Sequence, residues 1–188
     1  ARERSAIPTS GTEGGRPVQR KDHGFDVVYL SGIDWGYRRQ RPQHIAEALG
    51  RAGNRVLYIS TVFDQDPSGV GYSIIGQPAA NVLEVRLRTS RTGTGALHFI
   101  SDTDAGSEVA KSLVAACGAL CSSPLIVIVD HPAWHPVCRD LPCDALVYDC
   151  IDNVRAFPGT RPELVEEEHR LAERADILIA RSEEHTSE

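Results

Sequence analysis

The amino-acid sequence predicts an α/β protein built on a mostly parallel sheet with helices on both faces. Short apolar runs, typical of buried strands, alternate along the chain with segments whose apolar residues recur at helical spacing. Only tight, Gly-containing turns separate some helices from the following strand. Repeated strand–helix alternation of this kind favours parallel strands joined by right-handed crossovers.

The first unit of this pattern is a strand, a loop, a helix and a second strand. Residues 26–30 form the first apolar run, and the turn-prone residues 31–36 follow it. Pro42 suits the first turn of a helix that we expect to end near Gly50 to Gly53. Residues 55–60 repeat the apolar pattern, so the second strand should lie parallel to the first.

The middle of the chain is less regular. Residues 61–101 are rich in Gly and Ser, except that residues 82–87 alternate apolar and charged side chains like an edge strand. Residues 108–120 carry the spacing of a helix. Residues 125–129 form the most strand-like run of the chain, so we expect a central strand there.

The last part of the chain continues the alternation. We expect strands at residues 145–148 and 176–180, on either side of a helix over residues 162–175 whose first turn is Glu-rich. The expected fold is Rossmann-like, with the strands in the order 3-2-1-4-5. Loops after strands one, four and five would then meet at the carboxyl edge of the sheet, where such folds bind ligands.

Both ends of the chain are expected to lie outside this domain. Residues 1–24 are polar and predict a disordered leader. Residues 181–188 resemble a translated sequencing adapter, so we expect non-native read-through there and a natural protein that continues beyond Ala180. The chain also contains no methionine, so we expect its true start to be missing. The predicted domain therefore covers residues 25–180.

Composition excludes several classes of function. The net charge of −6 argues against nucleic-acid binding, because no basic face is available for phosphates. No run reaches the roughly 20 apolar residues of a membrane span, which predicts a cytoplasmic protein and leaves peripheral membrane contact open. The five cysteines lack the spacing of a zinc site, so we interpret them as buried or idle thiols.

The first candidate site residues surround the expected start of the first helix. A helix N-terminus has free backbone amides and a favourable dipole for an anion, so basic and polar side chains there predict a phosphate or carboxylate site. The alternative is a solvated face with the histidine in the helix packing. The candidates are Trp35, Arg41, Gln43 and His44.

Further candidates follow strands four and five. Asp149 and Asp152 lie three residues apart, close enough to bind sugar hydroxyls together, although either could instead cap a turn. His131 belongs to a segment, residues 130–135, whose two imidazoles and indole suit stacking on a sugar. Two histidines at this spacing lack a third ligand of known geometry, so we expect no metal.

Two patches of sequence carry a family resemblance. Residues 35–46 with 55–59 resemble the W…RPQH-A…VLYV opening of bacterial group-1 glycosyltransferases, including teichuronic-acid-type enzymes. Residues 146–153 with 175–180 resemble the YDC-x-D…AD-L-A block of the same family, in the same order. The resemblance covers about residues 25 to 180. It implies the amino-terminal, acceptor-side half of a two-domain GT-B fold, without the nucleotide-sugar domain.

The resemblance also implies a function. Enzymes of this family, which the resemblance implies to be of the retaining type, move a sugar from a nucleotide-sugar donor to a cell-surface polysaccharide, glycolipid or similar saccharide or lipid-linked acceptor. They use no cofactor beyond the donor substrate and generally no metal, and one domain alone should be inactive. The alternatives are another GT-B enzyme, such as a nucleotide-sugar epimerase, or a non-catalytic saccharide- or nucleotide-binding module.

Overall fold

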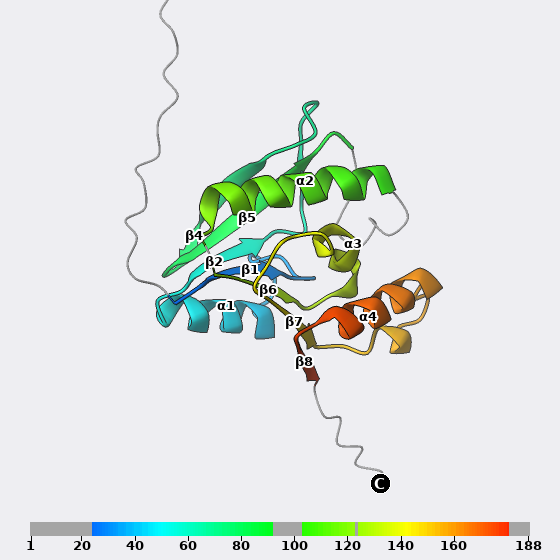
Figure 1. Cartoon of the computed structure of the whole chain (residues 1–188). Coiled ribbons are helices and arrows are strands. Elements are labelled where there is room, and N and C mark those ends of the chain that lie inside the picture. The colour runs from blue at the N-terminus through cyan, green and yellow to red at the C-terminus, as the bar shows by residue number, and fades with distance from the viewer. Residues whose placement is uncertain (1–23, 92–102, 123, 181–188) are drawn as a thin grey trace, which may run out of the picture.

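A computed structural model describes residues 24–91, 103–122 and 124–180 (Figure 1). The expectations for residues 1–23 and 181–188 fall outside these ranges. The strands are β1 (Asp26–Leu30), β2 (Arg55–Ile59), β3 (Asp64–Gln65), β4 (Tyr72–Ala79), β5 (Val82–Thr89), β6 (Leu125–Val129), β7 (Ala145–Cys150) and β8 (Ile177–Ala180). The helices are α1 (Arg41–Arg51), α2 (Thr103–Leu120), α3 (His135–Cys138) and α4 (Pro162–Arg174), with 3-10 turns η2 (Pro132–Trp134) and η3 (Val154–Ala156).

The sheet has the predicted parallel topology. Its strand order is β3-β5-β2-β1-β6-β7-β8, and β4 is added antiparallel to β5. Counted from the predicted strands, this is the expected order 3-2-1-4-5, extended by β8. The strand β1 lies at the centre, because Asp26 pairs with Arg55 of β2 on one side and with Leu125 of β6 on the other. The winding therefore reverses between β1 and β6, as a Rossmann-like fold requires.

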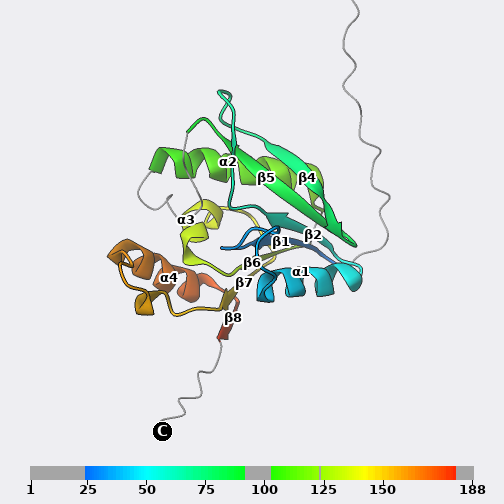
Figure 2. The ribbon, with the colours of Figure 1, turned by 180° about the vertical axis from the view of Figure 1, so that it is seen from behind.

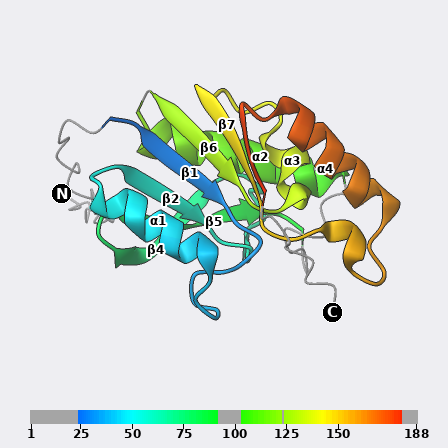
Figure 3. The same cartoon turned by 90° about the horizontal axis from the view of Figure 1, so that it is seen from below.

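Helices cover both faces of the sheet, and alternate strand residues face each layer. Val28 and Leu30 of β1 pack in the cluster beneath α2, α3 and α4, whereas Val27 and Tyr29 pack beneath α1. Figures 2 and 3 show α1 alone on its face, across the sheet from α2. In the described part of the chain, no helix combines the length and apolar character needed to cross a bilayer.

The prediction that residues 82–87 form an edge strand is wrong. The strand β5 lies inside the sheet, because β2 pairs with one side of it and β4 pairs with the other. The strand β4 was not predicted, since none of its side chains is buried and they give no apolar pattern. Its Gly76, its Pro78 and two register shifts are features of an edge strand.

Two other segments are more helical than the sequence predicts. The helix α2 begins at Thr103, five residues before the expected start at Glu108. The expected loop over residues 130–135 contains η2, which His131 caps by accepting a hydrogen bond from the Ala133 backbone amide. Pro132 occupies the first position of that turn, where its missing amide hydrogen costs no hydrogen bond.

Gly50 of α1 gives a testable prediction about how α1 meets the sheet. A Cβ atom at Gly50 would lie 2.2 Å from the Ala80 carbonyl oxygen, between β4 and β5. Gly50→Ala should therefore destabilise the fold by about 3 kcal/mol, the upper end for overpacking, because backbone must move. Gly118→Ala is the matched control, since a Cβ atom in that part of α2 meets open space and should add about 0.5 to 1 kcal/mol of helix propensity. Urea unfolding of both variants should give opposite signs, and two equal changes would contradict the prediction.

Candidate functional site at the carboxyl edge of the sheet

The loops after β1 and β6 are joined into one unit by Asp130. Its buried carboxylate accepts hydrogen bonds from Ser31 Oγ at 2.8 Å and from the Gly32 backbone amide at 2.6 Å. The indole Nε1 of the buried Trp134 donates to the Ser31 carbonyl oxygen at 2.8 Å. Asp130 and Trp134 therefore both fix the start of the loop that follows β1.

Gly32 brings His131 close to the β1 loop. A Cβ atom at Gly32 would lie 3.0 Å from the Cβ of His131, so a larger residue would push the two loops apart. His131 Nδ1 accepts from the Ala133 amide at 3.2 Å, which fixes the orientation of the ring. These contacts place His131 beside the switch point between β1 and β6.

Arg41 and Asp149 form a bidentate ion pair across the same edge. Arg41 Nε lies 2.8 Å from Asp149 Oδ2, and Arg41 Nη2 lies 2.9 Å from Asp149 Oδ1. Asp149 is 1% exposed, whereas the Arg41 side chain is 45% exposed. The hydrogen bonds to Asp149 raise the pKa of Arg41. Asp149 therefore holds a permanently charged guanidinium at the first residue of α1, facing solvent.

The position of Asp149 differs slightly from the prediction. The sequence placed it just after the fifth strand, but β7 continues through Cys150, so Asp149 is a strand residue. Val147, two residues before Asp149, faces the α1 layer. Because alternate residues of a strand share a face, Asp149 lies on that same face. This is why the Asp149 side chain meets the start of α1.

A pocket of about 350 Å³ opens beside this ion pair. It lies between the start of α1 and the residues that follow β7. Asp152, which is exposed, is on its wall and next to Arg41. The lining residues are Gln40, Arg41, Pro42, Cys150, Ile151 and Asp152.

Gln43 serves the loop before α1 and does not face the pocket. Its Oε1 accepts from the Gln40 backbone amide at 3.0 Å, and its Nε2 donates to the Asp34 carbonyl oxygen at 3.2 Å. The side chain is 0% exposed, so no ligand can touch it in this structure. Its role is to position the loop that precedes Arg41.

Trp35 and His44 lie at different depths. Trp35 is half-buried and packs edge-on against Tyr58 with the ring centroids 5.0 Å apart. The Arg39 guanidinium lies 6.0 Å from the Trp35 ring. His44 is exposed on the first turn of α1, so the alternative that placed it in the helix packing is wrong. Trp35 thus supports the loop, and His44 is accessible.

Two polar groups of this edge were missed by the sequence reasoning. Asp34 Oδ1 accepts from Ser60 Oγ at 2.6 Å and from the Thr61 amide at 2.9 Å, which ties the β1 loop to the β2 loop. The buried Tyr29 hydroxyl has no hydrogen-bond partner among the described residues. Burial and the nearby Asp130 and Asp149 raise the pKa of Tyr29. An aspartate in the loop directly after a buried strand was the available signal for Asp34.

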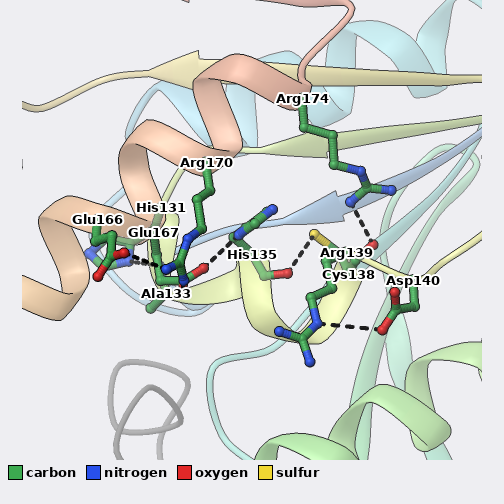
Figure 4. Close-up of polar contacts among 10 residues, drawn as sticks. All are labelled: His131, Ala133, His135, Cys138, Arg139, Asp140, Glu166, Glu167, Arg170 and Arg174. Carbon is green, nitrogen blue, oxygen red and sulfur yellow. Dashed lines mark hydrogen bonds and ion pairs between the residues drawn. The ribbon is translucent and has the colours of Figure 1, made fainter.

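A polar chain, buried at His135 and Glu167, fixes α4 against the segment after β6 (Figure 4). His135 Nδ1 lies 2.6 Å from Glu167 Oε2, and Arg170 Nη1 donates to Glu167 Oε1 at 2.6 Å. Arg174 Nη1 donates to the Cys138 carbonyl oxygen at 3.1 Å one turn further along α4 (Figure 4). The second histidine of residues 130–135 is therefore a packing residue and does not join His131 in the site.

Burial shifts the pKa values of Asp130 and His131 in opposite directions. Desolvation raises the pKa of Asp130 to about 7, although the Gly32 and Ser31 hydrogen bonds favour its charged form. Desolvation lowers the pKa of His131 to about 4, and the nearby Asp152 opposes this shift. Near pH 5.5 both side chains are therefore uncharged.

These shifts predict opposing effects on the pH dependence of stability. Asp130 binds a proton more tightly in the folded state. Its contribution to the free energy of unfolding is therefore present at low pH and is lost as the pH rises to about 7. His131 binds a proton less tightly when folded, so its contribution is lost as the pH falls from 6.5 towards 4. Each group changes the free energy of unfolding by at most about 1.4 kcal/mol per pH unit, with opposite signs. Between pH 4 and 6.5 the two changes should therefore cancel.

Single variants should separate the two slopes. Relative to the parent chain, Asp130→Asn should gain stability as the pH rises from 4.5 to 7, and His131→Gln should lose stability from 4.5 to 6.5. Urea unfolding at several pH values measures both differences. Parallel lines for parent and variants would show that neither group titrates as its burial predicts.

Comparisons with known proteins give no match. Neither a family model, nor a curated protein, nor a solved structure matches the chain. The described residues contain no group of three or more His, Cys, Asp or Glu side chains that could hold a metal ion.

Proposed function

We propose that this domain is the acceptor-side half of a glycosyltransferase that takes a sugar from a nucleotide-sugar donor. One observation carries the proposal: the Arg41 guanidinium is fixed by a buried carboxylate at the start of α1, beside a pocket at the carboxyl edge of a doubly wound sheet. Ligands of such sheets bind at this edge, at the reversal between β1 and β6. The resemblance of residues 35–46 and 146–153 to group-1 glycosyltransferases supports the same function.

The chemistry of sugar transfer fits a fixed cation at this place. Breaking the bond between the sugar and the nucleoside diphosphate leaves negative charge on the leaving group, and a preorganised cation lowers the barrier by stabilising that charge. Arg41 already has its guanidinium oriented by Asp149, so little reorganisation is needed when charge develops. The dipole of α1 adds to the same field, although Pro42 has no amide hydrogen and the Gln43 amide is already capped by the Gln40 side chain.

The remaining site residues fall into two groups. Asp152 lines the pocket and His44 is exposed on the first turn of α1, so a carboxylate and an imidazole are accessible to hydroxyls of a saccharide or lipid-linked acceptor. Trp35, Gln43 and Asp149 support the loop or Arg41. His131 belongs to neither group and is half-buried beside Gly32. In this proposal a second domain binds most of the donor, and the enzyme works in the cytoplasm.

The proposal is tested by comparing the chain with the full-length protein from the parent gene. Each is incubated with labelled nucleotide sugars, with and without saccharide and lipid-linked acceptors, and the release of nucleoside diphosphate and labelled product is followed. The full-length protein should transfer label only when an acceptor is present, and the 188-residue chain should show no turnover.

Other outcomes would point elsewhere. Conversion of one nucleotide sugar into another without an acceptor would assign an epimerase, and binding without any reaction would assign a non-catalytic module. Robust transfer by the 188-residue chain would contradict the division of the site between two domains.

A further inference from the structure

A second pocket, of about 450 Å³, lies at the opposite edge of the sheet from the candidate site. It adjoins Leu125, the first residue of β6, and Asp144, which precedes β7, so it is at the edge where these parallel strands begin. The two pockets share no lining residue. Nothing in the proposed sugar transfer uses this second pocket.

Thiols are concentrated in this pocket. Cys117 of α2, Cys121 just after the end of α2, and Cys143 of the segment before β7 line it, against an apolar wall that includes Leu141. All three are free cysteines, and Cys117 is buried whereas Cys121 and Cys143 are half-buried. The interpretation of the cysteines as idle thiols did not foresee that three of the five would share one cavity.

Cys117 and Cys121 are one helical turn apart and face the same cavity. The Cys121 backbone amide donates to the Cys117 carbonyl oxygen at 2.9 Å, so the turn between them is regular helix. The neighbouring Cys121 thiol lowers the pKa of Cys117. The two side chains therefore line the same pocket from positions one turn apart.

This spacing does not suit a disulfide. Residues four apart in a helix have Cβ atoms about 5 to 6 Å apart, whereas a disulfide requires about 3.5 to 4.5 Å. A bond between Cys117 and Cys121 would therefore unwind the end of α2. An ion placed between the two sulfur atoms spans the wider gap without moving the helix.

The end of α2 is held in place by contacts with residues of β1 and β2. Arg55 Nη1 donates to the Leu120 carbonyl oxygen, and Asp26 accepts from the Ser122 backbone amide. Asp144 Oδ2 accepts from the Leu125 amide at 2.7 Å on the facing wall. The positions of Cys117 and Cys121 are thus set before any ligand arrives, which is what a tight site requires.

We propose that Cys117 and Cys121 form a two-coordinate site for a soft, monovalent metal ion of the Cu(I) class. Thiolates select soft ions over Mg²⁺ or Ca²⁺. A tetrahedral zinc site is not formed, because no group of three or more ligating side chains comes together among the described residues. Each thiol loses its proton to solvent as its sulfur binds the ion, and the ion keeps its oxidation state.

The proton release gives the site a pH dependence. A free cysteine thiol has a pKa of about 8.5, so near neutral pH each ligand must lose a proton as the ion binds. The apparent affinity should therefore increase as the pH rises.

The test is a competition experiment on the reduced 188-residue chain without oxygen. Cu(I) bound to bicinchoninate is titrated with protein, and the loss of the coloured complex reports transfer to the protein. We expect one Cu(I) per chain and an affinity that rises between pH 6 and pH 8. Cys121→Ser should lower the affinity at least about 100-fold, more than the loss of a supporting contact around a metal would.

Cys143→Ser is the matched control, because it removes a thiol from the same pocket and leaves the ligand pair intact. Its affinity should stay within about threefold of the parent, and X-ray absorption at the copper edge should show two sulfur ligands. Because Cys121 is half-buried, Cys121→Ser should keep the thermal transition of the parent, so it remains informative even if Cys117→Ser does not fold. Unchanged affinity in Cys121→Ser, or no transfer to the parent chain, would overturn the proposal.

Discussion

Replacing Arg41 by alanine should lower the free energy of unfolding by about 3 kcal/mol, because it leaves the buried Asp149 carboxylate without its partner. Breaking a buried ion pair from one side costs about 3 to 5 kcal/mol. We expect the lower end of that range, since Arg41 is half exposed and water can enter the space that its side chain leaves. Urea unfolding at neutral pH measures the change.

Two comparisons isolate the pair. In a double-mutant cycle, adding Asp149→Asn to Arg41→Ala should recover part of the lost stability, because the unpaired charge is then gone. Arg39→Ala is the matched control: Arg39 lies in the loop just before α1 and pairs with Glu47 at the surface, where ion pairs contribute about 0.2 to 1 kcal/mol. Equal losses for Arg39→Ala and Arg41→Ala would show that burial of Asp149 does not matter.

The same substitution should affect catalysis in the full-length enzyme, as a consequence of the proposed function. Loss of a charge-assisted contact worth about 1.5 to 3 kcal/mol lowers kcat/KM by roughly tenfold or more. Because Arg41→Ala also destabilises the fold, the kinetics should be measured well below the melting temperature of the variant. Arg39→Ala should keep kcat/KM within about twofold. An Arg41→Ala enzyme with unaltered kinetics would remove Arg41 from the site.

Trp134→Ala should have an equally large effect on stability. Trp134 is fully buried, packs edge-on against Phe63, and donates its indole hydrogen to the Ser31 carbonyl oxygen. Removing a buried aromatic side chain costs about 3 to 5 kcal/mol, and an unsatisfied carbonyl adds to the loss. Because Trp134 connects the β6 segment to the β1 loop, the loss should also loosen Gly32 and His131.

Trp134→Phe separates packing from the hydrogen bond, because it keeps an aromatic ring and removes only the donor and part of the volume. We expect about 1 to 2 kcal/mol for this variant. Hydrogen exchange should show faster exchange of the Gly32 amide in both variants. Unchanged exchange at Gly32 would mean that Asp130 alone holds the loop.

The sheet order was predictable because its inner strands are apolar on both faces. Helix layers bury three of these strands on both faces, at residues 26–30, 55–59 and 125–129. Strands of this kind are mostly apolar along their whole length, so they can be recognised in the sequence. The strand β4 was not predictable in the same way. None of its side chains is buried, and its pairing with β5 is made by backbone groups that leave no apolar pattern.

The meeting of the loops could be predicted, but not the role of each side chain. Parallel topology alone brings Arg41, His131 and Asp149 to one edge, and the structure places them there. The burial of Gln43 and Asp149 depends on how the loop before α1 folds back, which sequence spacing does not encode. Asp130 and Asp34 act through backbone amides of distant loops, and such contacts become visible only in three dimensions.

The central place of β1 determines the order in which the sheet can be completed during synthesis. The strand β1 emerges first, yet one of its two neighbours, β6, begins 99 residues later, and Asp130 must reach Ser31 over the same separation. Until then, one side of β1 exposes unpaired backbone groups on an apolar strand, a template for wrong pairing with other chains. Closing such a distant pair is slow, so the nascent chain depends on protection of this edge until residues 125–129 have left the ribosome.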